Sequence, residues 1–429
     1  MIKNILTLIF PFFIALQLSA QWSLDSLSIA RSEVGAVEYN GKLYFVGGTN
    51  FDLSFSDWSL ANKKIDIYDT STGIVDSLFI PTQRQYSIAE VYNDKLYIVG
   101  DNNELSIYDF DSATWNSQNL IGLGDVYRTA RIGNLLLMSN QFGNLNLLDM
   151  DTDIVSAFDM PEETALVAMT ACGGKFILAG GGYPYDNTDL VQIYDPASDT
   201  WTSSSLSESK ANLRGACRNG MAYFAGGETD VAEYTTKVEI YDVSNETWAI
   251  NSIPVGRDEL TVKATENAVY IGGGHNLSLD DDYPTDVSIF TSPTNAQVVE
   301  LPEGRLHIGI IGFQDKAYFI GGADFNKKNY RSRIDIFDEL SIMTKTNNIE
   351  VMSFDVFPNP ATDNLSISTE MTNEFLNGRY SIISAFGTAV LEGVFQNNID
   401  IKDLPSGYFQ LVFYNEDKNH IWTTSFAKM

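Results

Sequence analysis

The residues best suited to grip a ligand are arginines that recur where a repeated pattern begins. They are Arg31, Arg84, Arg128, Arg214, Arg257 and Arg305. A guanidinium group donates two parallel hydrogen bonds to a carboxylate, so arginines that converge at one opening would hold an anionic ligand. The alternative is structural: each arginine bonds carbonyl groups or an Asp of a neighbouring repeat. The chain has 56 acidic and only 27 basic residues, and we favour the structural role.

A second set of candidate ligand-binding residues lies in or beside the variable loops of the pattern. It consists of Trp58, Tyr183, Tyr185, His275, Tyr283 and His307. Tyr and Trp rings stack on sugars or anchor protein partners, and they equally well form a cap over a scaffold. Because loops carry binding more often than strands do, we predict that these residues contact a protein or glycan ligand.

Residues for a metal centre or a cofactor are scarce in this sequence. The three histidines, His275, His307 and His420, do not lie at ligand spacing from one another. The acidic run 280–282 with Asp286 lacks the spacing of a Ca²⁺-binding loop. The chain has neither a Gly-x-Ser-x-Gly nucleophile motif nor a phosphate-binding loop. The sequence therefore predicts no metal and no cofactor.

The candidate residues sit on a repeat of four predicted strands, of which the second ends in Gly-Gly. The pairs are Gly47-Gly48, Gly180-Gly181, Gly226-Gly227, Gly272-Gly273 and Gly321-Gly322, and the last four are 46, 46 and 49 residues apart. The third strand ends in an aromatic residue and Asp, as in Tyr68-Asp69, and this Asp is predicted to bond the turn amides that follow. Seven repeats are recognisable, and the third lacks its Gly-Gly pair.

The repeat resembles the kelch family over residues 21–338, and its period is that of kelch propeller blades. The resemblance implies four-stranded blades around a central channel. We predict an all-β chain with a seven-bladed propeller, or a six-bladed one if the third repeat is no blade, followed by a small C-terminal β-sandwich. Residues 22–27 favour a strand that stands before any blade. We expect this strand to complete the last blade and leave no free sheet edge.

The first residues of the chain indicate export. Lys3, an apolar run over residues 5–18 and small residues before position 21 are typical of a secretory signal peptide. The run is short for a membrane span, so we predict that residues 1–20 are removed. No other segment is apolar enough to cross a bilayer, which predicts a chain without a transmembrane segment after removal.

The last residues, 351–429, differ in pattern from the repeats and favour the β-sandwich. Residues 357–363, 404–408 and the late Lys428 resemble the sorting domain of the type IX (Por) secretion system. The resemblance implies that residues 351–429 engage the type IX machinery of a Gram-negative bacterium, with the mature chain released or attached to the cell surface. The alternative is an ordinary adhesive sandwich, because such a fold alone does not fix function. Residues 339–350 are the predicted linker.

Charge and cysteine content narrow the partners further. A net charge of −29 repels phosphate backbones, which excludes nucleic acid as a natural partner. Cys172 and Cys217 hold matching positions in neighbouring repeats. Matching positions on neighbouring blades usually lie farther apart than the roughly 7 Å that a disulfide allows between Cα atoms. We therefore expect two buried thiols.

The function predicted from these features is a non-catalytic binding protein, secreted or at the cell surface, that recognises a protein or glycan. The rival hypothesis is a sugar-acting enzyme, similar to the sialic-acid mutarotases or epimerases found among kelch propellers. Its acid–base groups would be Arg305 with His307, or Arg257 with Asp258 and Glu259. A structural component of the cell surface is the third alternative.

Overall fold

The computed structural model describes residues 22–339 except 52–61, 121, 183–185, 231–232, 279–282 and 325–328. It also describes residues 350–429 except 354–355, 368–378, 385–388, 395–397 and 415–419. The chain divides into two compact units, Met1–Glu339 (unit 1) and Leu340–Met429 (unit 2). The elements delimited in the described residues are β-strands, in agreement with the all-β prediction. Within the same residues, no helix combines the length and the apolar character needed to cross a membrane.

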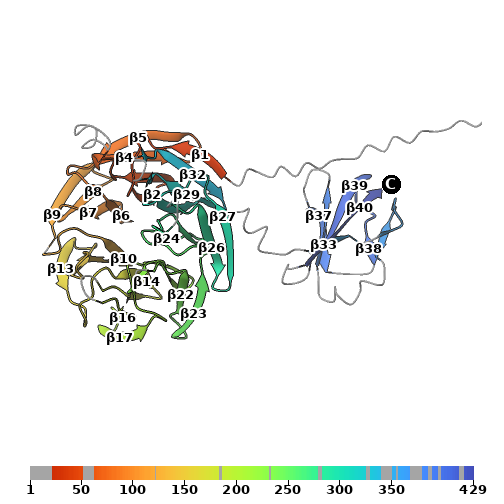
Figure 1. Cartoon of the computed structure of the whole chain (residues 1–429). Coiled ribbons are helices and arrows are strands. Elements are labelled where there is room, and N and C mark those ends of the chain that lie inside the picture. Colours follow the sequence, from red (N-terminus) through yellow and green to blue (C-terminus); the bar gives the residue numbers. More distant parts are fainter. Residues whose placement is uncertain are drawn as a thin grey trace, which may run out of the picture. The chain divides into compact units, whose positions relative to one another are not determined.

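Unit 1 contains seven four-stranded antiparallel sheets in its described part, and Figure 1 shows them set radially in a propeller-like arrangement. The first three sheets are β2 (Gly35–Tyr39), β3 (Lys42–Val46), β4 (Lys64–Asp69) and β5 (Gly73–Phe79); β6 (Ser87–Tyr92), β7 (Lys95–Gly100), β8 (Glu104–Asp109) and β9 (Thr114–Asn119); and β10 (Arg128–Ile132), β11 (Leu135–Ser139), β12 (Leu145–Asp149) and β13 (Ile154–Phe158).

The next three sheets are β14 (Ala168–Cys172), β15 (Lys175–Ala179), β16 (Leu190–Asp195) and β17 (Thr200–Ser205); β19 (Arg214–Arg218), β20 (Met221–Ala225), β22 (Lys237–Asp242) and β23 (Thr247–Ser252); and β24 (Thr261–Ala264), β25 (Val269–Gly272), β26 (Asp286–Ser292) and β27 (Asn295–Glu300). Two short pairs accompany them: β18 (Lys210–Ala211) with β21 (Glu228–Thr229), and β30 (Ala323–Asp324) with β31 (Asn329–Tyr330).

The seventh sheet joins the two ends of unit 1. It consists of β28 (Gly309–Phe313), β29 (Lys316–Ile320), β32 (Arg333–Asp338) and β1 (Trp22–Ser26). β1 pairs antiparallel with β32 over its full length, from Trp22 opposite Phe337 to Ser26 opposite Arg333. The Trp22 ring packs on Phe319 and Phe337, with ring centroids 5.3 and 4.9 Å away. The first described strand of the chain is thereby held on the last sheet.

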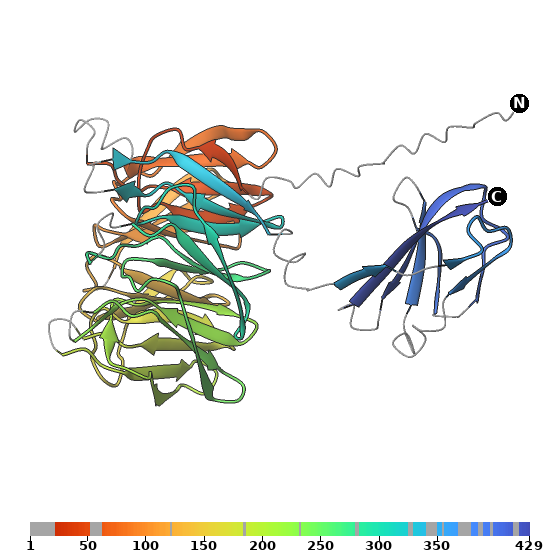
Figure 2. The same ribbon diagram turned by 45° about the vertical axis from the view of Figure 1, so that its right-hand side comes forward.

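The second and third strands of each sheet are more buried than its fourth strand. The second and third strands, such as β7 and β8, are almost wholly buried because neighbouring sheets cover both of their faces (Figure 2). Tyr223 and Ile240 of one sheet, for example, share a core with Val269 and Phe290 of the next. The fourth strands β9, β17 and β23 instead contain only exposed and half-buried residues, as expected for strands at the outer edge of a sheet.

In each Gly-Gly pair the first glycine lies against the next sheet, and the second lies against the segment that precedes the first strand of its own sheet. Gly47 and Gly48 have positive φ angles of 56° and 98°. A Cβ atom on Gly48 would lie 2.4 Å from the carbonyl oxygen of Ser32, so only glycine fits. In the sixth repeat this role falls to Gly273 and Gly274, because Gly272 still belongs to β25.

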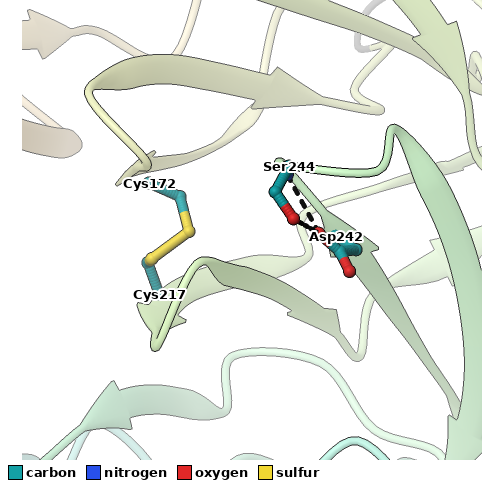
Figure 3. Close-up of a disulfide and its surroundings, with 4 residues drawn as sticks. All are labelled: Cys172, Cys217, Asp242 and Ser244. Atoms are coloured by element: carbon teal, nitrogen blue, oxygen red, sulfur yellow. Dashed lines mark hydrogen bonds between the residues drawn. A yellow bond between two sulfur atoms is a disulfide. The ribbon is translucent and has the colours of Figure 1, made fainter.

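The Asp residues at the ends of the third strands cap the following turns, as predicted. The Oδ1 atom of Asp242 accepts a hydrogen bond from the backbone N–H of Ser244 at 2.9 Å (Figure 3), and Asp69 does the same for Ser71 at 2.9 Å. Hydrogen bonds from Ser244 and then Asn245 lower the pKa of Asp242 to about 2. Each capped turn leads directly from the third strand into the fourth.

The expectation of two free thiols is wrong, since Cys172 and Cys217 form a disulfide (Figure 3). They lie on β14 and β19, the first strands of two neighbouring sheets, and their Cα atoms are 5.4 Å apart. First strands stand closest to the centre of a radial arrangement, where sheets converge (Figure 1). Matching positions on such strands therefore come within disulfide distance, although matching positions farther out do not.

Unit 2 consists of two sheets in its described part. One contains β33 (Glu350–Ser353), β40 (His420–Lys428), β39 (Gly407–Tyr414), β36 (Arg379–Ser384) and β37 (Ala389–Val394) in this order. The other contains β34 (Val356–Phe357), β35 (Asn364–Ile367) and β38 (Asn398–Asp400). Leu365 and Ile399 of the smaller sheet share a core with Ile382 and Leu411 of the larger one, so the two sheets pack face to face.

Candidate functional site

The first strands of the seven sheets line a cavity of about 650 Å³ at the centre of unit 1. These strands are β2, β6, β10, β14, β19, β24 and β28. Small residues such as Ala36, Ala130 and Ala216 line much of the cavity, beside larger ones such as Met169 and Lys263. At one end, the charged side chains at the start of the first strands set the chemistry of the cavity.

That end of the cavity is built by the segments that precede the first strands. In the sheets that begin with β2, β24 and β28, this segment is bridged to the segment that follows the second strand, as in the pairs Ser32 with Thr49 and Asp258 with His275. The residue directly after the bridge has a left-handed backbone, with φ angles of 57° at Glu33, 49° at Glu259 and 54° at His307. Leu166 and Asn212 have the same conformation at the same place of their repeats, with φ angles of 52° and 63°, so this backbone shape belongs to the repeat.

The polar residues gathered at this end of the cavity are called the mouth below. They are Glu33, Asn212, Asp258, Glu259, His275 and His307, together with Arg128 and Arg214. They come from five different sheets, which explains why no local sequence motif contains them.

Four of the six predicted arginines lie outside the mouth, buried inside their own sheets. Arg31, Arg84, Arg257 and Arg305 are fully buried. Their carboxylate partners are Asp66 at 3.0 Å, Glu104 at 3.4 Å, Asp286, and Asp335 at 2.7 Å, respectively. These partners belong to the third strand of the same sheet, so the expectation of bonds to a neighbouring repeat is wrong. The side chain turns inward along its own sheet, where backbone carbonyl groups also accept its hydrogen bonds.

Arg128 and Arg214 are a different class of arginine. They are the first residues of β10 and β19 and line the cavity, whereas Arg31, Arg257 and Arg305 each lie four residues before their strand. In the β19 sheet that earlier place is taken by Lys210, which is buried 3.4 Å from Glu239. The sequence alone did not separate the two classes. Arg214 stands only four positions after Lys210, so it was assigned the place in the repeat that Lys210 holds.

The two mouth arginines meet at Asn212. Arg128 Nη2 and Arg214 Nη1 donate to its Oδ1 at 3.4 and 3.2 Å. In the part of the chain that the structure describes, neither guanidinium has a carboxylate within ion-pair distance. Burial, and then the charge of Arg214, holds the pKa of Arg128 well below its usual value, and burial lowers that of Arg214 as well.

The acidic and histidine side chains form the other half of the mouth. His307 Nε2 lies 3.1 Å from Glu259 Oε2, and His307 Nδ1 lies 3.3 Å from Glu33 Oε1. His275 Nδ1 lies 3.5 Å from the same Glu259 oxygen. The hydrogen bond from His307 lowers the pKa of Glu259. Burial raises the pKa of both Glu33 and Asp258.

Of the predicted loop residues, His275 and His307 reach the mouth. Tyr283 is half-buried, and its carbonyl oxygen lies against Gly304, next to the buried Arg305. Trp58, Tyr183, Tyr185 and the acidic run 280–282 lie outside the described residues.

Glu33 and Asn212 were missed by the sequence reasoning. Both stand two positions after the buried basic residue of their repeat, as Glu259 and His307 do. The sequence does carry a signal for these positions. A polar residue of varying type stands at a fixed distance after each of the buried basic residues Arg31, Lys210, Arg257 and Arg305.

One family model matches part of unit 2. Residues 355–424 match the family model described as a secretion system C-terminal sorting domain (Por_Secre_tail). This match supports export by type IX secretion, contact of these residues with that machinery, and a secreted or cell-surface location. The search of curated proteins gives no match to this chain.

Proposed function

We propose that unit 1 is a closed, seven-bladed kelch propeller that binds an acidic glycan at its mouth, on or outside the cell that exports it. The kelch assignment is supported by the seven four-stranded sheets and by the Gly-Gly pairs, which in repeat after repeat occupy positions where a Cβ atom would clash with backbone. The pairing of β1 with β32 supports closure, because it joins the first and last strands of unit 1 in one sheet. The binding role goes beyond these features and rests on the mouth.

The observation that carries the binding role is the pair Arg128 and Arg214. Two guanidinium groups share one amide oxygen in a cavity, and within the described residues neither has an acidic partner. Burial, and for Arg128 the charge of Arg214, lowers the pKa of both arginines, although the charges of Asp258 and Glu259 act in the opposite direction. An anion bound between the two guanidinium groups would further favour their charged state. A carboxylate accepts two parallel hydrogen bonds from such a group, so a ligand with a carboxylate fits this side of the mouth.

The opposite side of the mouth suits the hydroxyl groups of a sugar. Glu33, Asp258 and Glu259 offer carboxylate oxygens that accept hydrogen bonds. On the arginine side, the Tyr127 ring lies against the Arg128 guanidinium group, and Tyr86 packs on Tyr127 with ring centroids 5.3 Å apart, so apolar ring surface is available there. A sugar acid combines both chemistries, which makes it a better fit than a neutral sugar or a purely apolar ligand.

The test is calorimetric titration of the full exported chain with sialic, glucuronic and galacturonic acids and with the matching neutral sugars. At least one acid is expected to bind, and Arg214→Gln is expected to weaken it by about tenfold to a hundredfold, since hydrogen bonds to charged groups contribute about 1.5–3 kcal/mol. Arg218→Gln is the matched control, because Arg218 ends the same strand and bonds the carbonyl groups of Glu266 and Thr291. Equal binding of acids and neutral sugars, or no effect of Arg214→Gln, would contradict the proposal.

A sugar-acting enzyme is the second candidate, favoured by the hydrogen-bonded pair Glu259 and His307. A carboxylate 3.1 Å from an imidazole, beside an anion site, has the groups for general acid–base chemistry on a bound sugar. NMR exchange between the two anomers of the acid distinguishes the two candidates, followed at the anomeric proton of glucuronic or galacturonic acid and at the C3 protons of sialic acid. Accelerated exchange that disappears in Glu259→Gln supports the enzyme, and binding at the uncatalysed exchange rate supports the binding protein.

A further inference from the structure

We propose that Asp258, Glu259 and His275 form a binding site for a divalent transition-metal ion, with Zn²⁺ as its representative. One candidate ligand atom from each of these three side chains lies within 4.8 Å of the other two. At metal–ligand bonds of about 2.0–2.2 Å, two ligands of a tetrahedral ion stand roughly 3.4 Å apart. The 3.5 Å between His275 Nδ1 and Glu259 Oε2 already matches such an edge.

The backbone fixes two of the three side chains relative to each other. The N–H of Asp258 donates to the carbonyl of His275 at 3.2 Å, and the N–H of His275 donates to the carbonyl of Asp258 at 3.1 Å. This close pairing requires Gly274, where a Cβ atom would lie 2.4 Å from the carbonyl oxygen of Asp258. Glu259 follows with φ at +49°, which differs from the extended backbone of the strand it precedes. A site held in this way needs little rearrangement to accept an ion.

Unsatisfied polar atoms at the same place provide an independent indication of a missing ligand. Asp258 is only 9% exposed, and although its Oδ2 accepts a hydrogen bond from Asn212 at 2.8 Å, its Oδ1 has no hydrogen-bond partner among the described residues. His275 Nδ1 likewise lacks a hydrogen bond there. Leaving a buried carboxylate oxygen and a ring nitrogen unbonded is costly, and one cation between them would satisfy both.

The surroundings resemble the outer shell of a metal site. Glu259 is held by His307 at 3.1 Å and Asp258 by Asn212 at 2.8 Å, and such bonds orient metal ligands. One imidazole with two carboxylates suits Zn²⁺ and its first-row neighbours, whereas Ca²⁺ and Mg²⁺ prefer oxygen ligands alone. Three protein ligands leave a coordination position open to water or to a ligand in the mouth.

The test is titration of the chelator-treated full chain with Zn²⁺ alone, without sugar, by calorimetry. One ion is expected to bind, and Asp258→Asn and His275→Gln are each expected to weaken it by about a hundredfold or more. His307→Gln, which removes a positioning contact, is expected to weaken it by about tenfold. His420→Gln is the matched control, because it removes a histidine of unit 2 and leaves the mouth intact. X-ray absorption at the zinc edge should show nitrogen and oxygen neighbours at about 2.0–2.2 Å.

Absence of Zn²⁺ binding to the folded chain, or binding that survives in both Asp258→Asn and His275→Gln, would overturn the proposal. Thermal melting of each variant separates loss of the site from loss of the fold. The sugar-acid titrations are run on metal-free protein, so the metal site and the glycan site can fail independently of each other.

Discussion

The buried arginines and the mouth arginines of unit 1 have the same side chain and opposite surroundings. Arg31 lies 3.0 Å from Asp66, and both side chains are fully buried, so its charge is neutralised inside the sheet. Arg214 begins a first strand and points its charge at a cavity in which the described residues offer it no carboxylate at ion-pair distance. A shift of four positions along the repeat thus separates an arginine that holds a sheet together from one that is available to a ligand.

The comparison is tested most strongly by the stability of Arg31→Met against that of Arg214→Gln. Arg31→Met leaves the Asp66 carboxylate buried without its guanidinium and is expected to cost about 3–5 kcal/mol of unfolding free energy. Arg214→Gln removes no ion pair and should cost less than about 1 kcal/mol. Chemical denaturation of both variants measures the difference. Similar losses in both would mean that the two classes do not exist.

A second test concerns the disulfide, which belongs to the scaffold although Cys217 lines the cavity. Replacing both Cys172 and Cys217 by Ser is expected to lower the unfolding free energy by about 2–4 kcal/mol, because the bond closes a loop of 45 residues. Denaturation is measured with and without a reducing agent. The reductant should destabilise the native chain and leave the double variant unchanged; a native chain indifferent to reduction would refute the role.

The smallest expected effect contrasts two carboxylates at opposite ends of the strands. Burial raises the pKa of Asp101, on the mouth side, to about 6, whereas turn hydrogen bonds lower that of Asp242 to about 2. Between pH 4 and 6 the folded state holds the Asp101 proton more tightly than the unfolded state, so Asp101 reduces stability as pH rises through this window. The contribution of Asp242 is present above its ordinary value of 3.8 and is lost as pH falls through about 2.

NMR titration of the two carboxyl groups checks both values directly. Asp101→Asn should remove part of the decline in melting temperature between pH 4 and 6 that Asp101 causes. Asp242→Asn should leave that range unaltered, since Asp242 is ionised throughout it. Identical midpoints for the two groups would show that the mouth side and the turn side do not differ electrostatically.

Much of the scaffold could be predicted because the same position in each repeat requires the same residue type for a steric or hydrogen-bonding reason. Gly48 faces the carbonyl oxygen of Ser32, and Asp242 meets the amide of Ser244, whichever ligand the protein binds. Such needs recur with the repeat and are therefore visible in one sequence. The predicted all-β class follows from signals of this kind. The sorting domain was recognised instead from motifs that occur once, at residues 357–363 and 404–408.

The mouth was predicted only in part because its residues vary from repeat to repeat. His275 and His307 were named, but Glu33 and Asn212 carry no motif and come together only in the folded chain. The arginines were grouped by residue type. Their roles depend on whether they stand at the first residue of a strand or about four residues before it, which only the strand boundaries reveal. The disulfide was missed for a similar reason, since the distance between repeats depends on how near a strand lies to the centre.

The position of β1 has a consequence for how the chain matures. Residue 22 emerges early during synthesis, yet its partner Phe337 follows more than 300 positions later. Until β32 arrives, the hydrogen-bonding groups of β1 have no strand to join, and contacts so distant in sequence form slowly. A nascent chain of this design gains its final sheet only after nearly the whole of unit 1 has been made.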